Sequence, residues 1–214
     1  MQTTEKPVRL AGRTLRENRH ICAFFHSKAE QDAVLMPFFK EGLERGEKVF
    51  NIVDPLLKEE YIGRMEQHGI PARENLKRGQ IEVRVWEEAY LRDGYFDSER
   101  MVRVLTEVLT ENRQQYGLTR LMGNMEWALQ TLPGVTDIVE YETKLNYVLC
   151  DFPDPVVCAY DLNRHSASVV MDILRTHPMV IVGGILQENP LYVPPDEFLA
   201  ELKSRRKHAG PPAH

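Results

Sequence analysis

Short apolar runs recur along the chain, and each is the length of a strand. The runs are nearly continuous in hydrophobic residues and rich in β-branched or aromatic side chains. A strand that is covered on both faces has this pattern because neither side meets water, and parallel sheets are covered on both faces. The pattern predicts strands at residues 21–25, 48–53, 81–86, 120–125, 156–160 and 180–185.

Between these runs, apolar residues recur with the spacing of helices. Ser27 followed by Glu30 has the pattern of a capping box before the first helix, although Pro37 predicts a kink or a later start. Asp54 precedes a second helix, and Asp97 precedes a third. Further helices are expected over residues 136–149, over 166–175 and after Pro195. The alternation predicts an α/β fold: a doubly wound, mainly parallel sheet of about six strands with helices on both faces.

The composition fits a single domain without a nucleic-acid surface. The chain has 214 residues, of which 43% are hydrophobic and 28% charged, and its formal net charge is −5. No direct contact with nucleic acid is therefore expected, and no apolar run is long enough to cross a membrane. We expect a flexible segment over residues 1–17, one domain over 18–207 and a disordered tail over 208–214. Three cysteines without a CxxC pair favour free thiols and a cytoplasmic protein.

The carboxyl ends of the predicted strands carry aromatic and acidic side chains. In an open α/β sheet ligands bind beyond these ends, and aromatic walls with a few carboxylates suit a small-molecule pocket. The candidate ligand-binding residues are Phe25, His26, Asp54, Trp86, Tyr90, Glu126, Trp127, Tyr160 and Asp161. Structural explanations stay open for some of them, with Asp54 as a helix cap, Asp161 in an Asx turn and Trp127 packed beneath a loop.

The corner after the first strand, FFHSKAEQD, lacks the glycines that a phosphate-binding loop needs. Only Ser27 and Lys28 resemble parts of such a loop, so ATP hydrolysis of the usual kind is not expected. Sequence patterns typical of hydrolases and zinc proteases are missing as well. We therefore expect a binding protein rather than an enzyme, with no cofactor. A degenerate ATPase or another enzyme on the same scaffold is the alternative.

A second group of reactive side chains is predicted inside the sheet. His20 and Cys22 point to one face of the first strand, and Cys158 can face them from a neighbouring strand. With His177 these residues suit a metal site, and the two cysteines alone suit a thiol sensor. We favour a third explanation, a buried cysteine pair beside a histidine and no metal, because free cysteine is usually buried and a buried thiol is inert.

Other polar residues are explained by packing. Tyr141, Glu142 and Asn146 share one side of the helix over 136–149, where the tyrosine packs into the core and the carboxylate is paired. Arg120 opens a strand and is expected to pair with a carboxylate.

Ordered motifs along the chain resemble one known family. The segment RHICAFFHSKAEQDAVLMPFFKEGLERGEKVFNIVD resembles the opening of MEDS domains, the DcmR-type sensory domain of methanogens and methylotrophs. The segments YLRDGYFDSERM, RLMGNMEWAL, YETKLN, VVCAYDLNR and THPMVIVGG follow in order, within residues 18–192. The resemblance implies a RecA/KaiC-like core without its P-loop. It also implies that the first strand lies between the fourth and the last of five core strands. HICAFF, RLMGNME and VVCAYD are then neighbours, and His26, Glu126, Trp127 and Asp161 surround one opening.

The resemblance also implies a function: a sensory or regulatory module for a small molecule, with hydrocarbon derivatives as proposed ligands. Family members often adjoin a histidine kinase or a helix-turn-helix domain, and neither is recognisable in this sequence. We therefore expect the signal to pass to a separate signalling protein, such as a histidine kinase or a transcription regulator, or through a homodimer. A ligand-free interaction module in a kinase or anti-sigma-type pathway is the remaining alternative.

Overall fold

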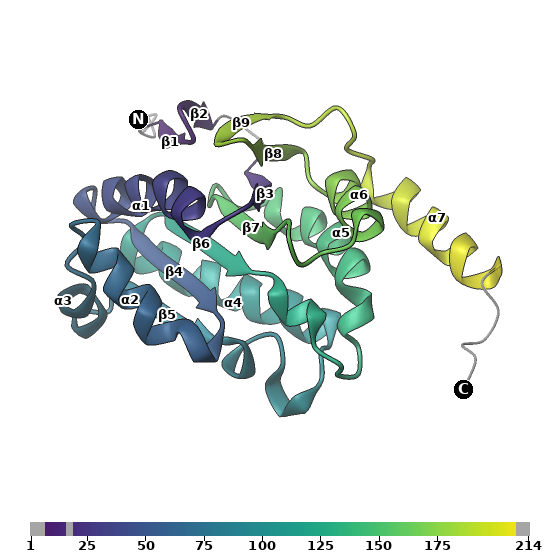
Figure 1. Cartoon of the computed structure of the whole chain (residues 1–214), viewed down its shortest axis with the longest axis horizontal. Coiled ribbons are helices and arrows are strands. Elements are labelled where there is room, and N and C mark those ends of the chain that lie inside the picture. Colours follow the sequence, from purple (N-terminus) through teal and green to yellow (C-terminus); the bar gives the residue numbers. More distant parts are fainter. Residues whose placement is uncertain (1–6, 16–18, 209–214) are drawn as a thin grey trace.

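The structure, a computed structural model that describes residues 7–15 and 19–208, is built around a seven-stranded sheet (Figure 1). In spatial order the strands are β5 (Ile81–Val85), β4 (Lys48–Val53), β6 (Thr119–Asn124), β7 (Val156–Asp161), β3 (His20–Phe25), β8 (Met179–Val182) and β9 (Ile185–Glu188). Neighbouring strands are parallel except β8 and β9, which are antiparallel. The prediction of a mainly parallel α/β sheet is confirmed.

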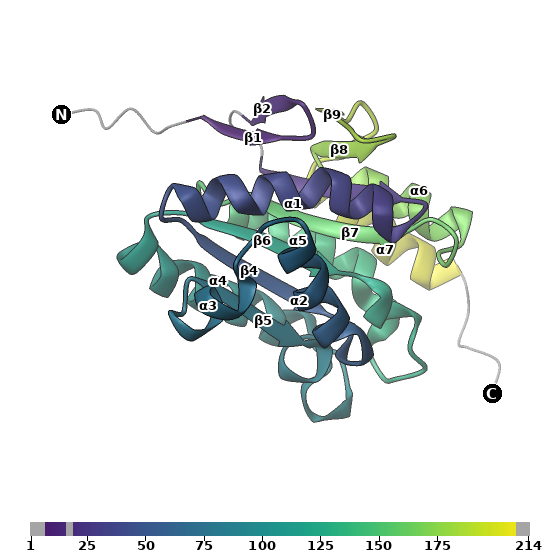
Figure 2. The ribbon, with the colours of Figure 1, turned by 60° about the vertical axis from the view of Figure 1, so that its left-hand side comes forward.

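Helices cover both faces of this sheet (Figure 2). One face carries α1 (Lys28–Glu44), α2 (Lys58–Gln67) and α3 (Ala72–Lys77), and the other carries α4 (Ser98–Tyr116), α5 (Ile138–Leu149) and α6 (Ala167–Thr176). The last helix, α7 (Pro195–His208), packs against α5 and α6. Alternate residues of β3 enter the two cores, since Ile21 and Phe25 face α1 whereas Cys22 and Phe24 face α5.

The predicted helix caps are present. The Ser27 hydroxyl accepts a hydrogen bond from the backbone N–H of Glu30 at 3.2 Å, and Asp97 accepts one from the N–H of Arg100 at 2.7 Å. α1 begins directly after Ser27 and continues through Pro37, so the later start that the proline suggested is not found. The helix keeps an apolar face that is buried on both sides of the proline, and this burial outweighs the loss of one backbone hydrogen bond.

Two details of the predicted sheet are corrected. The run over residues 180–185 is not one strand, because Gly183 and Gly184 have φ of 58° and 72° and turn the chain from β8 into β9. Positive φ costs glycine little and strains other residues. In addition, β7 lies between β6 and β3, so the first strand borders the fifth and sixth strands rather than the fourth. The three strands that the resemblance predicts to be neighbours, now β6, β7 and β3, nevertheless lie next to one another in the sheet.

Part of the predicted flexible segment is a hairpin. β1 (Val8–Leu10) pairs antiparallel with β2 (Arg13–Leu15), and three of its apolar side chains are buried in the same core as α1. The backbone N–H of Leu186 in β9 donates to the carbonyl of Ala11, which places the hairpin beside that strand (Figure 2). Most of the other residues predicted to be flexible or disordered, namely 1–6, 16–17 and 209–214, lie outside the residues that the structure describes. His208, predicted to begin the disordered tail, is the last residue of α7.

A buried arginine ties α1 to β6. Arg120 is fully buried; its Nε donates to Glu47 at 2.5 Å, and its Nη1 donates to Glu41 at 3.0 Å and to the carbonyl of Phe38 at 2.5 Å. Gly42 makes room for the arginine, because a Cβ at that position would lie 2.6 Å from its side chain. The predicted pairing of Arg120 with a carboxylate is therefore confirmed.

Candidate functional site

A small hollow opens at the carboxyl ends of β3, β6 and β7, the sheet edge that the sequence indicates. Five of the predicted ligand-binding residues line it: Phe25, Asp54, Glu126, Tyr160 and Asp161. Its volume is about 80 Å³, roughly five to eight times the space that one water molecule needs. The hollow therefore has room for a ligand of only a few non-hydrogen atoms.

The corner between β3 and α1 forms one wall of the hollow, but its polar groups are engaged with one another. The Ser27 hydroxyl caps α1, and the Glu30 carboxylate accepts the backbone N–H of His26 at 2.7 Å. Lys28 donates to Glu60 at 2.9 Å. Side chains of the protein thus occupy the helix N-terminus at which nucleotide-binding proteins hold a phosphate.

Carboxylates at this edge hold the loops in place. Glu126 is buried, and its Oε1 accepts the backbone N–H of Asp161 at 2.7 Å, which joins the end of β6 to the end of β7. Asp161 in turn accepts the N–H of Asn163 at 2.8 Å in an Asx turn, and Asp54 accepts an N–H two residues further on at 2.9 Å. The structural explanations of Asp54 and Asp161 are confirmed, and both residues also line the hollow.

Two predicted ligand-binding residues lie in the hydrophobic core instead. Trp127 is fully buried, with its ring centroid 4.8 Å from that of Tyr90 and 4.3 Å from that of Phe96. The short helix Glu126–Leu129 turns the chain at the end of β6 and places the indole in this aromatic cluster. Neither Trp127 nor Tyr90 is among the residues that line the hollow, and both side chains lie in the hydrophobic core.

The two remaining predicted residues, Trp86 and His26, do not line this hollow, and Trp86 is buried in the hydrophobic core. Trp86 and Asp54 border a second, wider hollow, which the exposed Leu56 and the partly exposed Leu132 also line. His26 is exposed at the corner and is not among the lining residues of either hollow. The structure thus brings five predicted residues together and places one of them, Asp54, between the two hollows.

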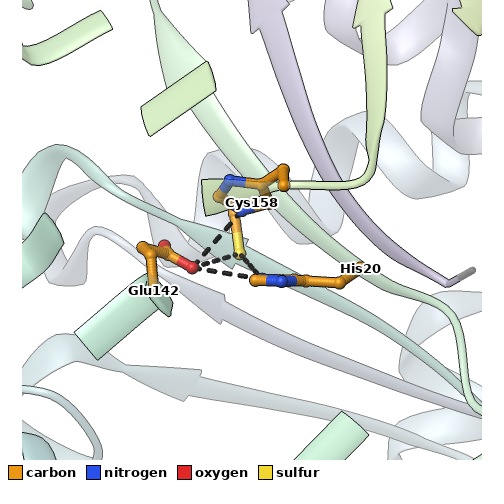
Figure 3. A group of neighbouring side chains, drawn as sticks. His20, Glu142 and Cys158 are labelled. Carbon is orange, nitrogen blue, oxygen red and sulfur yellow. Dashed lines mark hydrogen bonds and ion pairs between the residues drawn. The ribbon is translucent and has the colours of Figure 1, made fainter. Parts of the chain in front are cut away.

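A buried polar cluster forms where β3, β7, α5 and the end of α6 meet. Its members are His20, Glu142, Cys158 and His177, which are at most 3% exposed. Figure 3 labels the first three of them. Glu142 Oε2 lies 3.2 Å from Nε2 of His20, 3.4 Å from Nε2 of His177 and 3.4 Å from Sγ of Cys158. The sulfur of Cys158 lies 3.7 Å from Nε2 of His20. The four side chains therefore converge on one point inside the protein.

Burial and mutual contacts set the charges in this cluster. Burial raises the pKa of the Cys158 thiol, and the neighbouring Glu142 raises it further, so the thiol keeps its proton and donates to that carboxylate. Burial also lowers the pKa of His20. Burial acts to raise the pKa of Glu142, but the facing imidazoles of His177 and His20 outweigh it and hold that pKa well below its usual range. A buried carboxylate of this kind needs a compensating positive charge.

Comparison with known proteins identifies the family. The family model described as the MEthanogen/methylotroph, DcmR Sensory domain (MEDS) matches residues 19–178. The chain belongs to the MEDS family. A curated relative of this MEDS domain is the transcriptional repressor DcmR of Methylorubrum extorquens (strain DSM 6343 / CIP 106787 / DM4), which is 27% identical over 182 residues. The alignment covers 79% of this chain and 62% of the repressor. A sensory or regulatory role follows from the family.

The fold of the MEDS domain is similar to two solved structures from Pyrococcus horikoshii. The KaiC-like protein PH0186 has a TM-score of 0.52 at 14% identity, and the match covers 76% of this chain and 70% of that one. The protein PH0321, solved in complex with an unknown peptide, has a TM-score of 0.55 at 13% identity, with 78% and 77% covered. These likenesses show a RecA/KaiC-like core. Among the helices that the structure describes, none has the length and apolar character needed to cross a membrane.

In this MEDS domain the residues of the predicted metal alternative are brought together in part. His20 and Cys158 meet with His177, as that alternative requires. Cys22 is not a member, and its thiol donates a hydrogen bond to the backbone carbonyl of Met179 at 3.7 Å. Glu142, which the sequence explained as a paired core residue, is the fourth member instead. The signal that could have identified it is a carboxylate on the otherwise apolar face of α5.

Tyr160 connects the cluster to the hollow of the MEDS domain. Its side chain lines the hollow, and its hydroxyl donates to Glu142 Oε1 at 2.7 Å. A displacement of the Tyr160 side chain would therefore change both the wall of the hollow and the hydrogen bond to Glu142.

Proposed function

We propose that this MEDS domain senses a small molecule in the hollow at the ends of β3, β6 and β7. The observation that carries the proposal is the position of the hollow, at the sheet edge where α/β proteins bind ligands. Its walls combine apolar surface from Phe25, Ala159 and the ring of Tyr160 with charged side chains, namely Asp54, Asp161, Glu126, Lys28 and Arg164. This combination suits a compact, mainly apolar molecule with one polar group, such as a small hydrocarbon derivative.

The signal is proposed to leave through the loop between β4 and α2. Leu57 lines the first hollow, Leu56 lines the second, and Asp54 lines both. A ligand that displaces this loop changes the outer surface at the second hollow, which also includes Glu87 and Leu132 from the loops after β5 and β6. The ligand shifts the loop only through unequal affinity for its two positions.

The proposed receiver is a separate signalling protein, either a histidine kinase or a transcription regulator, or a second copy of the chain. The support is the relative DcmR, a transcriptional repressor, of which this chain covers 62%.

We further propose that the domain binds its ligand without catalysis, with a degenerate ATPase as the alternative. The support is the corner after β3, where Ser27 caps α1 and Lys28 pairs with Glu60 rather than leaving the helix N-terminus to a phosphate. A nucleotide would have to break both contacts.

The test is a thermal-shift screen with short-chain halogenated and oxygenated hydrocarbons, and with ATP and Mg²⁺ as a parallel arm. Gln31 lies on α1 at the hollow, and Gln31→Trp fills the space from that side. Glu44→Trp places the same ring at the exposed opposite end of α1 and is the matched control. A ligand at a hundredfold excess over its Kd should raise Tm by about 5–10 °C in a chain of this size.

Stabilisation of the wild type and of Glu44→Trp, but not of Gln31→Trp, would support the proposal. A shift of equal size in all three proteins would mean that the ligand binds elsewhere. Stabilisation by ATP with release of phosphate, lost in Glu126→Gln, would favour the enzyme instead, and a silent screen would favour the ligand-free interaction module.

A further inference from the structure

The buried cluster of His20, Glu142, Cys158 and His177 has the dimensions of a metal site. In a tetrahedral zinc site, bonds of about 2.0–2.3 Å place nitrogen and oxygen ligands about 3.3 Å apart, and nitrogen and sulfur ligands about 3.6 Å apart. Three contacts compare directly with these spacings: Oε2 of Glu142 lies 3.2 Å from Nε2 of His20 and 3.4 Å from Nε2 of His177, and the sulfur of Cys158 lies 3.7 Å from Nε2 of His20. All donor atoms of the cluster lie within 4.8 Å of one another.

The surroundings orient both imidazoles as metal ligands. Nδ1 of His177 lies 2.9 Å from the carbonyl of Ile173, which can only accept, and 2.7 Å from the Thr176 hydroxyl, which donates to that same carbonyl. We therefore assign the proton to Nδ1. The amide nitrogen of Asn146 lies within hydrogen-bond distance of three backbone carbonyls, which only accept, so its two N–H groups point toward them and its oxygen accepts from Nδ1 of His20 at 3.1 Å. Both Nε2 atoms therefore face the cluster. Metal-binding histidines usually donate their second N–H to a carbonyl or carboxylate in this way.

The carboxylate is oriented by the same kind of contact. Tyr160 donates to Oε1 of Glu142 at 2.7 Å, which leaves Oε2 as the atom nearest to His20, His177 and Cys158. Each of the four candidate ligands thus presents one donor atom to the centre of the cluster.

The contact between His177 and Glu142 is a second indication of a cation. Nε2 of His177 is fully buried and makes no hydrogen bond in the described part of the chain, although it is aimed at the cluster. When Nδ1 holds its proton, Nε2 has a lone pair, and a second lone pair on the Glu142 carboxylate lies 3.4 Å away. Two lone pairs that face each other without water need a cation or an extra proton between them.

We propose that His20, Glu142, Cys158 and His177 bind a divalent transition metal ion, with Zn²⁺ as the expected ion. Two imidazoles, a thiolate and a carboxylate oxygen form a donor set that zinc accepts in tetrahedral geometry. The charges of the thiolate and the carboxylate balance those of Zn²⁺, and the proton of the Cys158 thiol is released to solvent on binding. Because four side chains fill the coordination sphere, the site is structural rather than catalytic.

This inference goes beyond the proposed sensing function. The metal would join β3, β7, α5 and the end of α6, which are distant in sequence, at a point that Tyr160 links to the hollow. Filling the hollow with Gln31→Trp should leave metal binding unchanged, so failure of one proposal is distinguishable from failure of the other.

The experiment measures metal binding in the full chain. Cys150 is exposed, so Cys150→Ser serves as the background that removes adventitious thiol binding. This protein is stripped with a chelator under reducing conditions, reconstituted with Zn²⁺ or Co²⁺ and desalted. Metal content, Tm and the visible spectrum are then recorded. We expect one zinc per chain, a Tm above that of the stripped protein, and the spectrum of tetrahedral Co²⁺ with a thiolate charge-transfer band.

Two variants separate the proposed ligands from their surroundings. Cys158→Ala should lose the thiolate band and most of the bound zinc. Cys22→Ala removes a buried thiol at the paired position of the neighbouring strand, and it should retain both. Tyr160→Phe keeps all four ligands but removes the hydrogen bond to Glu142, and it should weaken zinc affinity by about 10- to 100-fold in competition with a chelating dye.

X-ray absorption at the zinc edge tests the ligand set in the wild type, so this test does not depend on the folding of any variant. It should show one sulfur neighbour at about 2.3 Å and three nitrogen or oxygen neighbours at about 2.0–2.1 Å. A folded wild type that takes up no zinc and gains no Tm would overturn the proposal in favour of a protonated histidine pair. A thiolate–cobalt band that persists in Cys158→Ala, or disappears in Cys22→Ala, would overturn the ligand assignment.

Discussion

Replacement of Arg120 by methionine tests how strongly the structure depends on a buried charge. The side chain is fully buried and serves two carboxylates, Glu41 and Glu47, as well as a backbone carbonyl of α1. Arg120→Met keeps the apolar stem but leaves those acceptors without their donor. Breaking a buried ion pair from one side costs about 3–5 kcal/mol. Arg45 lies 2.5 Å from Glu41 and partly compensates, so we expect a loss of about 2–4 kcal/mol.

Urea unfolding followed by circular dichroism measures this loss as a change in the free energy of unfolding. Arg78→Met is the matched control, since Arg78 pairs with Glu74 at 2.5 Å on the surface, where its side chain is 69% exposed. An exposed pair contributes less than about 1 kcal/mol. If Arg120→Met costs no more than Arg78→Met, the inference that the buried arginine ties α1 to β6 is refuted.

Two further predictions concern stability. Burial raises the pKa of Asp154 to about 6, whereas an unfolded aspartate titrates near pH 4. The carboxyl is protonated in both states below about pH 4 and is ionised at a cost to the folded state above about pH 6. The free energy of unfolding should therefore fall by at most about 3 kcal/mol between these values. Asp154→Asn can still accept the N–H of Thr119 and should abolish this pH dependence. Urea unfolding at several pH values measures it; the prediction is contradicted if the free energy of unfolding changes with pH equally in the wild type and the variant. Gly134 has a φ of 83°, and an added Cβ would lie 2.1 Å from the Phe96 carbonyl oxygen. Gly134→Ala should therefore lower the free energy of unfolding by more than about 1 kcal/mol, whereas Gly46→Ala, at a φ of 81° with nothing within 4 Å of its Cβ, should cost less; equal losses would argue against the clash.

Local sequence signals identified much of the sheet edge that lines the hollow, but not the direction of every side chain. Asp54 and Asp161 follow the ends of strands, and in a parallel sheet those ends share one edge, so their place at the hollow was predictable. Trp127 follows a strand end in the same way, yet a short helix directs it into the core. Its orientation depends on the aromatic cavity formed by Tyr90 and Phe96, which come from another loop and leave no periodic signal near residue 127.

The sequence by itself determined the α/β class, the helix caps and the residues at the sheet edge where the hollow opens, because these follow from side-chain periodicity and local hydrogen bonding. Only the tertiary structure decided that β7 lies between β6 and β3, since periodicity shows which face of a strand is buried but not which strand lies beside it. That order sets Cys158 beside His20, and the packing of α5 and α6 adds Glu142 and His177. The cluster therefore depends on long-range packing between four segments.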